Sequence, residues 1–217
     1  MLINNAGLSS TIVLSLTQII LTMKNNAVLI IAFALFLNPI FAQKSKLKVG
    51  KNAPSFDLST FKGENKTLEG LLTEKDYVLI HFFIGSWHSY DKAYLSKLQE
   101  IYPQLQAKNA EIFAITRERP VFLKSLQNEI KFDYPIGIDT DWYTMSNYGV
   151  AVKITKNYVP QKHKEYSVLN AKHTGSKDNM IPVPATFLIN KEGKIIWMHY
   201  ELDYRRRPDV KKILEQL

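Results

Sequence analysis

Residues 77–83 (YVLIHFF) form an almost continuous run of apolar and aromatic side chains. A β-strand that is buried on both faces of a sheet has this composition. The next segment, residues 90–107, carries apolar side chains at helical spacing, and residues 111–116 (EIFAIT) are a second apolar run. These three segments predict two buried strands with a helix between them.

Helices and strands continue to alternate toward the end of the chain. Pro120 suits the first turn of a helix, and Gly193 ends a segment that suits a hairpin turn. Residues 150–183 are polar and lack clear periodicity. The other predicted elements are an edge strand or hairpin arm at 52–58, a helix at 120–129, a strand at 134–138, a short helix at 142–148, a hairpin at 187–199 and a helix at 208–217. This order predicts an α/β fold with a central, mostly parallel or mixed sheet and helices on both faces.

The beginning of the chain does not have the pattern of a folded domain. Residues 27–37 are an uninterrupted apolar run that follows Lys24 and precedes the small residue Ala42, which together are the parts of a secretory signal. The run is too short for a comfortable membrane span, which takes about 20 apolar residues. We therefore predict a leader and signal peptide over residues 1–42, with Met23 as the candidate true start, and one domain over residues 43–217.

This interpretation makes the protein an exported one, either periplasmic or secreted. An uncleaved N-terminal anchor is the alternative, and contact with a membrane is expected only through this segment. The chain has 28 Lys and Arg against 20 Asp and Glu, a net charge of +8. Its basic residues are spread along the sequence and no nucleic-acid-binding module is recognisable, so we predict no nucleic-acid partner.

The 217-residue chain contains no cysteine, and this absence matters most in two segments. Residues 81–91 (HFFIGSWHSYD) run from the first buried strand into a turn and the start of a helix. Residues 183–190 (VPATFLIN) have the pattern of a loop and strand that face such a turn.

Four local sequences, in order along the chain, resemble the AhpC/TSA or peroxiredoxin-like family of the thioredoxin-like superfamily. The resemblance implies a thioredoxin-like fold in which Pro184 is cis and lies against the turn. Residues 50–56 (GKNAPSF) resemble the family's opening G-x-x-A-P-x-F, and residues 83–87 (FIGSW) resemble the approach to its W-C-P-Y-C turn. Residues 183–189 (VPATFLI) resemble its cis-proline loop, and residues 203–208 (DYRRRP) resemble a C-terminal D-Y-x-x-R-P signature.

The turn departs from the family pattern at the residues that carry its chemistry. Trp87 and Tyr90 are kept, Ser89 replaces the proline, and His88 and Asp91 occupy the two cysteine positions. Disulfide exchange and peroxide reduction both need a thiolate. The degenerate turn, with Val183 and Pro184 opposite it, is therefore not expected to catalyse thiol redox chemistry, although the family implies an antioxidant oxidoreductase.

Because residues three apart on a helix face the same way, His88 and Asp91 should lie together. Our first hypothesis is a pseudoenzyme that acts as a binding or interaction module, with a protein partner and no cofactor. The first alternative is a metal site in which His88 and Asp91 bind a divalent metal, either zinc or another transition metal. A second alternative is a small-ligand or hydrolytic site in which His88 acts as a base, although the sequence has no G-x-S-x-G elbow. The last alternative is a residual oxidoreductase role.

The metal hypothesis needs a third ligand, and four other histidines are candidates: His81, His163, His173 and His199. His81 lies within an apolar strand and is expected in the core, bonded to the backbone. His163 and His173 lie in the polar segment and are expected to be exposed.

Overall fold

A computed structural model describes residues 47–217 of the chain. The predicted signal peptide at 1–42 and the candidate start at Met23 lie outside these residues. Among the described residues, no helix combines the length and the apolar character that a membrane crossing requires.

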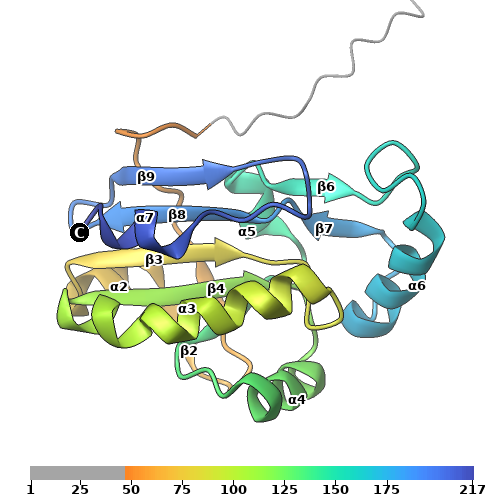
Figure 1. The fold of residues 1–217 in the computed structure, drawn as a ribbon, viewed down its shortest axis with the longest axis horizontal. Coiled ribbons are helices and arrows are strands. Elements are labelled where there is room, and N and C mark those ends of the chain that lie inside the picture. Colours follow the sequence, from red (N-terminus) through yellow and green to blue (C-terminus); the bar gives the residue numbers. More distant parts are fainter. Residues whose placement is uncertain (1–46) are drawn as a thin grey trace, which may run out of the picture. The chain divides into compact units, whose positions relative to one another are not determined.

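A five-stranded sheet runs through the centre of the domain in the order β5-β4-β3-β8-β9 (Figure 1). The β3–β4 and β4–β5 pairs are parallel, whereas the β3–β8 and β8–β9 pairs are antiparallel. The sheet is therefore mixed, and the predicted α/β fold is confirmed. The strands are β3 (Tyr77–Phe82), β4 (Ala110–Thr116), β5 (Ile136–Ile138), β8 (Ala185–Asn190) and β9 (Ile195–Tyr200).

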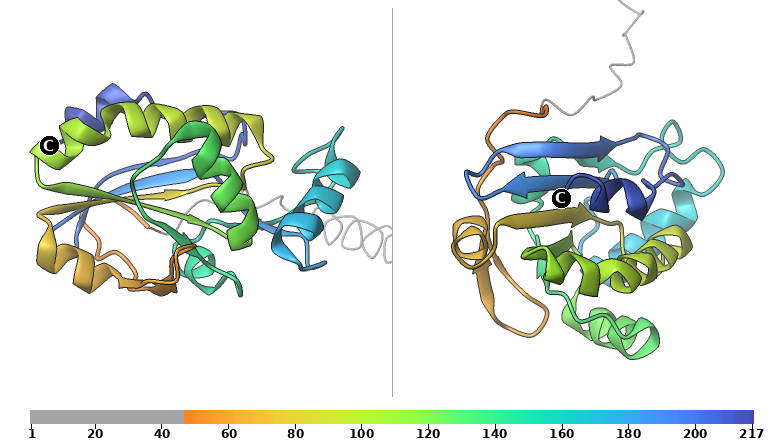
Figure 2. Two further views of the ribbon diagram at one scale, coloured as in Figure 1. Left: turned by 90° about the horizontal axis from the view of Figure 1, so that it is seen from below. Right: turned by 60° about the vertical axis from the view of Figure 1, so that its left-hand side comes forward.

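Helices cover both faces of this sheet (Figure 2). On one face lie α3 (Ser89–Ala107), α4 (Pro120–Ile130) and α7 (Val210–Leu214), and on the other lie α2 (Leu68–Glu74) and α5 (Tyr143–Asn147). Successive strand residues point to opposite faces. Leu79 accordingly enters the core on the α3 side and Ile80 the core on the α2 side, and neither is exposed. This is why the strand sequence is apolar at almost every position.

The segment without periodicity contains ordered elements beyond one end of the sheet. Residues 150–183 form β6 (Ala151–Lys153), α6 (His163–Thr174) and β7 (Met180–Pro182), with β6 and β7 paired antiparallel. The first hairpin is β1 (Asp57–Ser59) with β2 (Asn65–Thr67), so the arm predicted at 52–58 overlaps it only in part. Helix α2 was not predicted, and α7 is shorter than expected.

The prediction of a cis bond before Pro184 was wrong, because the described residues contain no cis peptide bond. Val183, which precedes it, is fully buried, and its N–H donates to the carbonyl of Val150 at 2.7 Å. This bond continues the pairing of β6 with β7 up to the proline. The trans isomer is the favoured form of an X–Pro bond by about 0.5–1 kcal/mol.

Candidate functional site

The degenerate turn joins the end of β3 to the start of α3. His88 is the residue immediately before α3, and its side chain makes no capping hydrogen bond. Asp91 lies in the first turn of the helix and is fully buried, while Ser89 and Tyr90 between them are exposed. His88 and Asp91 therefore meet on the inner side of the turn, as the spacing predicted.

The carboxylate of Asp91 is the centre of a buried network. Its Oδ2 accepts from the backbone N–H of Ile84 at 2.8 Å and contacts Nδ1 of His88 at 2.9 Å. Its Oδ1 pairs with Nη2 of Arg207, whose side chain is only 7% exposed. A charge removed from water is tolerated when it is paired and hydrogen-bonded in this way.

The electrostatics of Asp91 follow from these partners. Burial by itself would raise the pKa of the carboxyl group. The charge of Arg207 and the hydrogen bonds from His88 and Arg207 outweigh burial and hold the pKa of Asp91 well below its ordinary value. Asp91 is therefore an anion at neutral pH, and Nδ1 of His88, which faces it, carries a proton.

Aromatic rings surround His88, and its side chain is only 2% exposed. The ring centroids of Tyr90, Tyr166 and Tyr204 lie 5.6, 5.7 and 5.8 Å from that of His88. The Trp87 ring lies 6.0 Å away. Nε2 of His88 is buried and has no hydrogen-bond partner among the described residues. His88 therefore does not project into solvent, where a disulfide of another protein could reach it.

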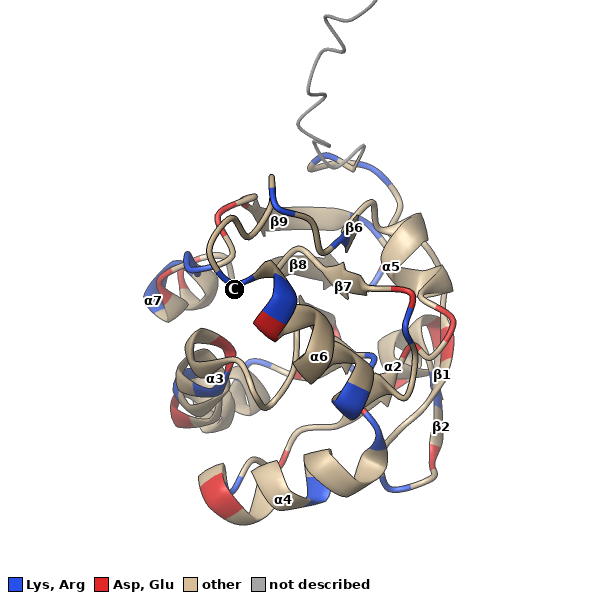
Figure 3. Cartoon of the chain, turned by 90° about the vertical axis from the view of Figure 1, so that its right-hand side faces the viewer, with Lys and Arg blue, Asp and Glu red and all other residues tan. Residues whose placement is uncertain are grey.

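Helix α6 covers the turn. Figure 3 shows this helix in front of the end of the sheet, with α3 and α4 beside it. Tyr166 of α6 packs its ring edge-on against Trp87, with the centroids 5.0 Å apart. His173, further along the same helix, is 6.3 Å from the same tryptophan ring. The polar segment of the sequence thus closes over the turn that contains Trp87 and His88.

A second buried cluster lies beside the first, centred on Glu118. Ser86 donates its backbone N–H to Oε2 at 2.7 Å and its hydroxyl to Oε1 at 2.6 Å. His173 bonds Oε1 through Nδ1 and stacks on Phe122, with ring centroids 3.9 Å apart. The expectation that His173 is exposed was wrong, because it is 8% exposed and ties α6 to the turn through Glu118.

The metal hypothesis finds no further ligand in the described part of the chain, since no three His, Asp or Glu side chains there are gathered as a metal site would need. Both oxygens of Asp91 already have partners. His81, in the core as expected, bonds the hydroxyl of Thr186 at 2.9 Å. A divalent metal on His88 and Asp91 would therefore have no third protein ligand within residues 47–217.

The family of the protein follows from sequence comparison. Residues 49–198 match the model of the AhpC/TSA family. The chain belongs to this family. It is 26% identical over 157 residues to the thiol-disulfide oxidoreductase ResA of Bacillus thuringiensis (strain Al Hakam), and the aligned region covers 72% of each of the two chains. It is 25% identical over 170 residues to ResA of Geobacillus thermodenitrificans (strain NG80-2), with 76% of each chain covered.

Solved structures confirm the thioredoxin-like, peroxiredoxin-type fold. A cysteine-to-serine mutant of PrxQ from Xylella fastidiosa superposes with a TM-score of 0.62 at 14% identity, covering 80% of this chain and 96% of that one. Peroxidoxin BcpB from Mycobacterium tuberculosis superposes with a TM-score of 0.59 at 16% identity, covering 78% of this chain and 96% of that one.

Arg207 lies beyond the residues that match the family model, so the guanidinium partner of Asp91 comes from outside that match.

Proposed function

We propose that this protein is a member of the AhpC/TSA family that has given up thiol chemistry and acts by binding. The observation that carries the proposal is the buried network of His88, Asp91 and Arg207 in the place of two thiols. A thiolate must attack a sulfur or a peroxide for the reactions of the redox members. Imidazole, carboxylate and guanidinium groups cannot replace it.

The access to the turn supports the same proposal. Thiol exchange with another protein needs a sulfur that the partner's disulfide can approach. Here the corresponding side chain, His88, is enclosed by Tyr166 of α6 and by Trp87. The cover by α6 favours a small ligand over a protein chain at this position, and a protein partner elsewhere on the surface stays a prediction.

Base catalysis by His88 is the second candidate. A carboxylate that orients an imidazole is the arrangement of many nucleophile-activating pairs. The hydroxyl of Ser86 is directed to Glu118 rather than to His88, and the hydrogen bonds of the described residues bring no nucleophile to His88. The structure therefore gives this candidate less support than binding.

The test of the proposal is an activity assay. The full chain is expected to match the buffer blank in reducing insulin disulfides with dithiothreitol and in consuming hydrogen peroxide. The thiol-disulfide oxidoreductase ResA of Bacillus thuringiensis, assayed alongside, is the positive control for disulfide reduction. Turnover by the cysteine-free chain above the blank, retained after repeated purification, would show that it performs redox chemistry without a thiol and would refute the proposal.

We infer that the protein works outside the cytoplasm. The support is the pattern of Lys24, the apolar run at 27–37 and the small residue Ala42. Fractionation of cells that express the full chain is expected to place a shortened protein in the periplasm or medium, with Gln43 as its first residue by N-terminal sequencing. Recovery of only the unshortened chain in the cytosol would contradict this inference.

A further inference from the structure

Helix α6, which covers the degenerate turn, has a buried face that is mostly polar. The residues that it buries are Tyr166, Asn170 and His173. Helix α3, by contrast, packs on the sheet with apolar and aromatic side chains, which are Tyr94, Leu95, Leu98, Ile101 and Leu105. Elements that bury little apolar surface are the ones that open most easily in a folded protein. The cover of the turn is therefore held less firmly than the helices on the sheet.

Asn170 makes the closed position of α6 costly. It is 1% exposed, yet neither its Oδ1 nor its Nδ2 has a hydrogen-bond partner within residues 47–217. It lies on the same face of the helix as Tyr166 and His173, whose rings lie near that of Trp87. Nε2 of His88, under the same helix, is also buried without a partner. Water would bond these three atoms if α6 moved away, so hydration favours an open form.

The C-terminal end of α6 is tied to the segment between β4 and α4. The backbone N–H of Arg119 donates to the carbonyl of His173 at 2.9 Å, and its Nη2 donates to the carbonyl of Lys172 at 2.6 Å. Glu118 bonds the ring of His173. Gly175 then ends the helix in the left-handed conformation, with a φ of 79°. This end of the helix is suited to act as a pivot.

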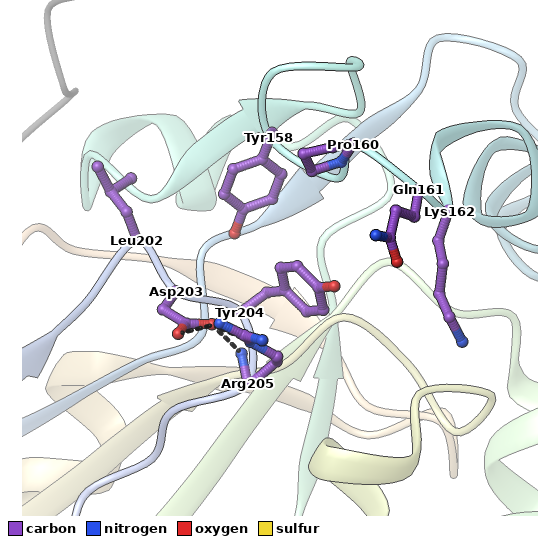
Figure 4. A pocket seen from close by; sticks show the side chains of 8 residues that line it. All are labelled: Tyr158, Pro160, Gln161, Lys162, Leu202, Asp203, Tyr204 and Arg205. Atoms are coloured by element: carbon purple, nitrogen blue, oxygen red, sulfur yellow. Dashed lines mark hydrogen bonds and ion pairs between the residues drawn. The ribbon is translucent and has the colours of Figure 1, made fainter.

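The N-terminal end of α6 is held more loosely. The helix begins after Lys162, whose side chain makes no capping hydrogen bond. Residues 160–162 line a pocket of about 500 Å³, and Figure 4 shows the side chains of Gln161 and Lys162 beside it. Tyr166 is the one buried residue among positions 163–166. Its ring lies 5.7 Å from the rings of His88 and Tyr204. This end of the helix therefore borders an open hollow and rests on the turn through one aromatic side chain.

We propose that α6 is a lid that swings about its C-terminal end and lifts Tyr166 and Asn170 away from Trp87 and His88. The structure is that of the closed form, and the open form is a minor population in exchange with it. Opening hydrates Asn170 and exposes the pair of His88 and Asp91 to a small ligand. This proposal rests on the binding function proposed above and states how a ligand reaches the covered turn.

The test is the rate at which a thiol placed under the lid reacts with iodoacetamide, followed by mass spectrometry on the full chain. Because the chain has no cysteine, each variant carries a single reactive group. His88→Cys places the thiol beneath α6, Ser89→Cys places it on the exposed side of the turn, and Leu98→Cys places it in the core. The His88→Cys thiol is expected to react about tenfold or more slower than the Ser89→Cys thiol. It should react about tenfold or more faster than the Leu98→Cys thiol, which reacts only when the whole protein unfolds.

A second substitution in the His88→Cys chain tests the role of Asn170. Asn170→Leu removes the unpartnered amide and keeps the branched shape of the side chain. It should slow the reaction by about tenfold, because the closed form no longer buries a polar group without partners. Lys164→Leu, at an exposed position of the same helix, should leave the rate within about twofold. Tyr166→Ala should raise the rate by about tenfold or more, because it removes the aromatic contact at the free end of the helix, and it tests the lid even if Asn170→Leu does not fold.

Three results would overturn the proposal. A His88→Cys thiol that reacts as slowly as the Leu98→Cys thiol would show that α6 does not open. One that reacts as fast as the Ser89→Cys thiol would show that α6 does not cover the turn. Equal rates in the Asn170→Leu and Lys164→Leu chains would show that the buried amide does not favour opening.

The failure of the lid is separable from the failure of the binding function itself. Redox turnover by the cysteine-free chain in the assay above would refute the proposed function, whatever the labelling rates are. A redox-inactive protein whose His88→Cys thiol is as unreactive as the Leu98→Cys thiol would refute only the lid.

Discussion

Replacing Arg207 with methionine is expected to lower the free energy of unfolding by about 3–5 kcal/mol, the typical cost of breaking a buried ion pair by removing one partner. The Arg207 side chain is 7% exposed and that of Asp91 is not exposed at all. Without the guanidinium, the Asp91 carboxylate would keep Ile84 N–H and His88 as its only partners within residues 47–217. Urea denaturation at neutral pH measures the effect.

The neighbouring Arg206 provides the matched control. Its side chain is 67% exposed and pairs with Glu201 at 3.4 Å on the surface. Arg206→Met should therefore cost no more than about 1 kcal/mol. The double variant Asp91→Asn, Arg207→Met should lose less stability than the sum of its two single variants, because no charge is left buried without a partner. Equal losses in Arg206→Met and Arg207→Met would show that the network does not hold the turn.

The sequence predicted the scaffold of this site better than its contents. Strands β3 and β4 were found because they are nearly continuous apolar runs, and helix α3 because its apolar side chains recur at helical spacing. The pairing of His88 with Asp91 was also predicted, since it depends only on helical spacing. Arg207 was not assigned to Asp91, because 116 positions separate them along the chain and local patterns carry no information about such contacts.

The cover over the turn was missed for a different reason. Helix α6 buries Tyr166, Asn170 and His173, a face too polar to give a hydrophobic period. Glu118 likewise has no local signal of its own. It follows the end of β4, however, and the carboxyl ends of parallel strands lie at one edge of a sheet, where the degenerate turn also lies. A search for polar residues at those strand ends would have found it.

The stability of the protein is expected to fall as the pH drops from neutrality, and His81 is the main cause. Burial, together with the charge of Arg207, lowers the pKa of His81 from 6.5 to about 3, against an opposing effect of Asp91. The unfolded chain therefore takes up a proton below pH 6.5 that the folded chain does not. Since the unfolded state then binds more protons, the free energy of unfolding falls by about 1.4 kcal/mol per pH unit for this group.

The pH window distinguishes His81 from the other groups. His199 lies across the sheet, and its pKa is also lowered by burial, so it adds a smaller slope in the same range. Asp91, whose folded pKa lies below its ordinary value, begins to contribute below about pH 5, where the carboxyl group of the unfolded chain starts to take up a proton. The loss of stability between pH 6.5 and 5 should therefore come mainly from histidine.

Replacing His81 with leucine should flatten the stability curve over that range. The variant loses the bond to Thr186 and is expected to be less stable than the parent at pH 7, but to lose less stability on acidification. Urea denaturation at half-unit pH steps, with His199→Gln as the comparison, measures both slopes. A parent and a His81→Leu variant with the same slope between pH 6.5 and 5 would mean that His81 accepts its proton in the folded protein. His81 would then titrate inside the folded core, and the loss of stability on acidification would have to come from other groups.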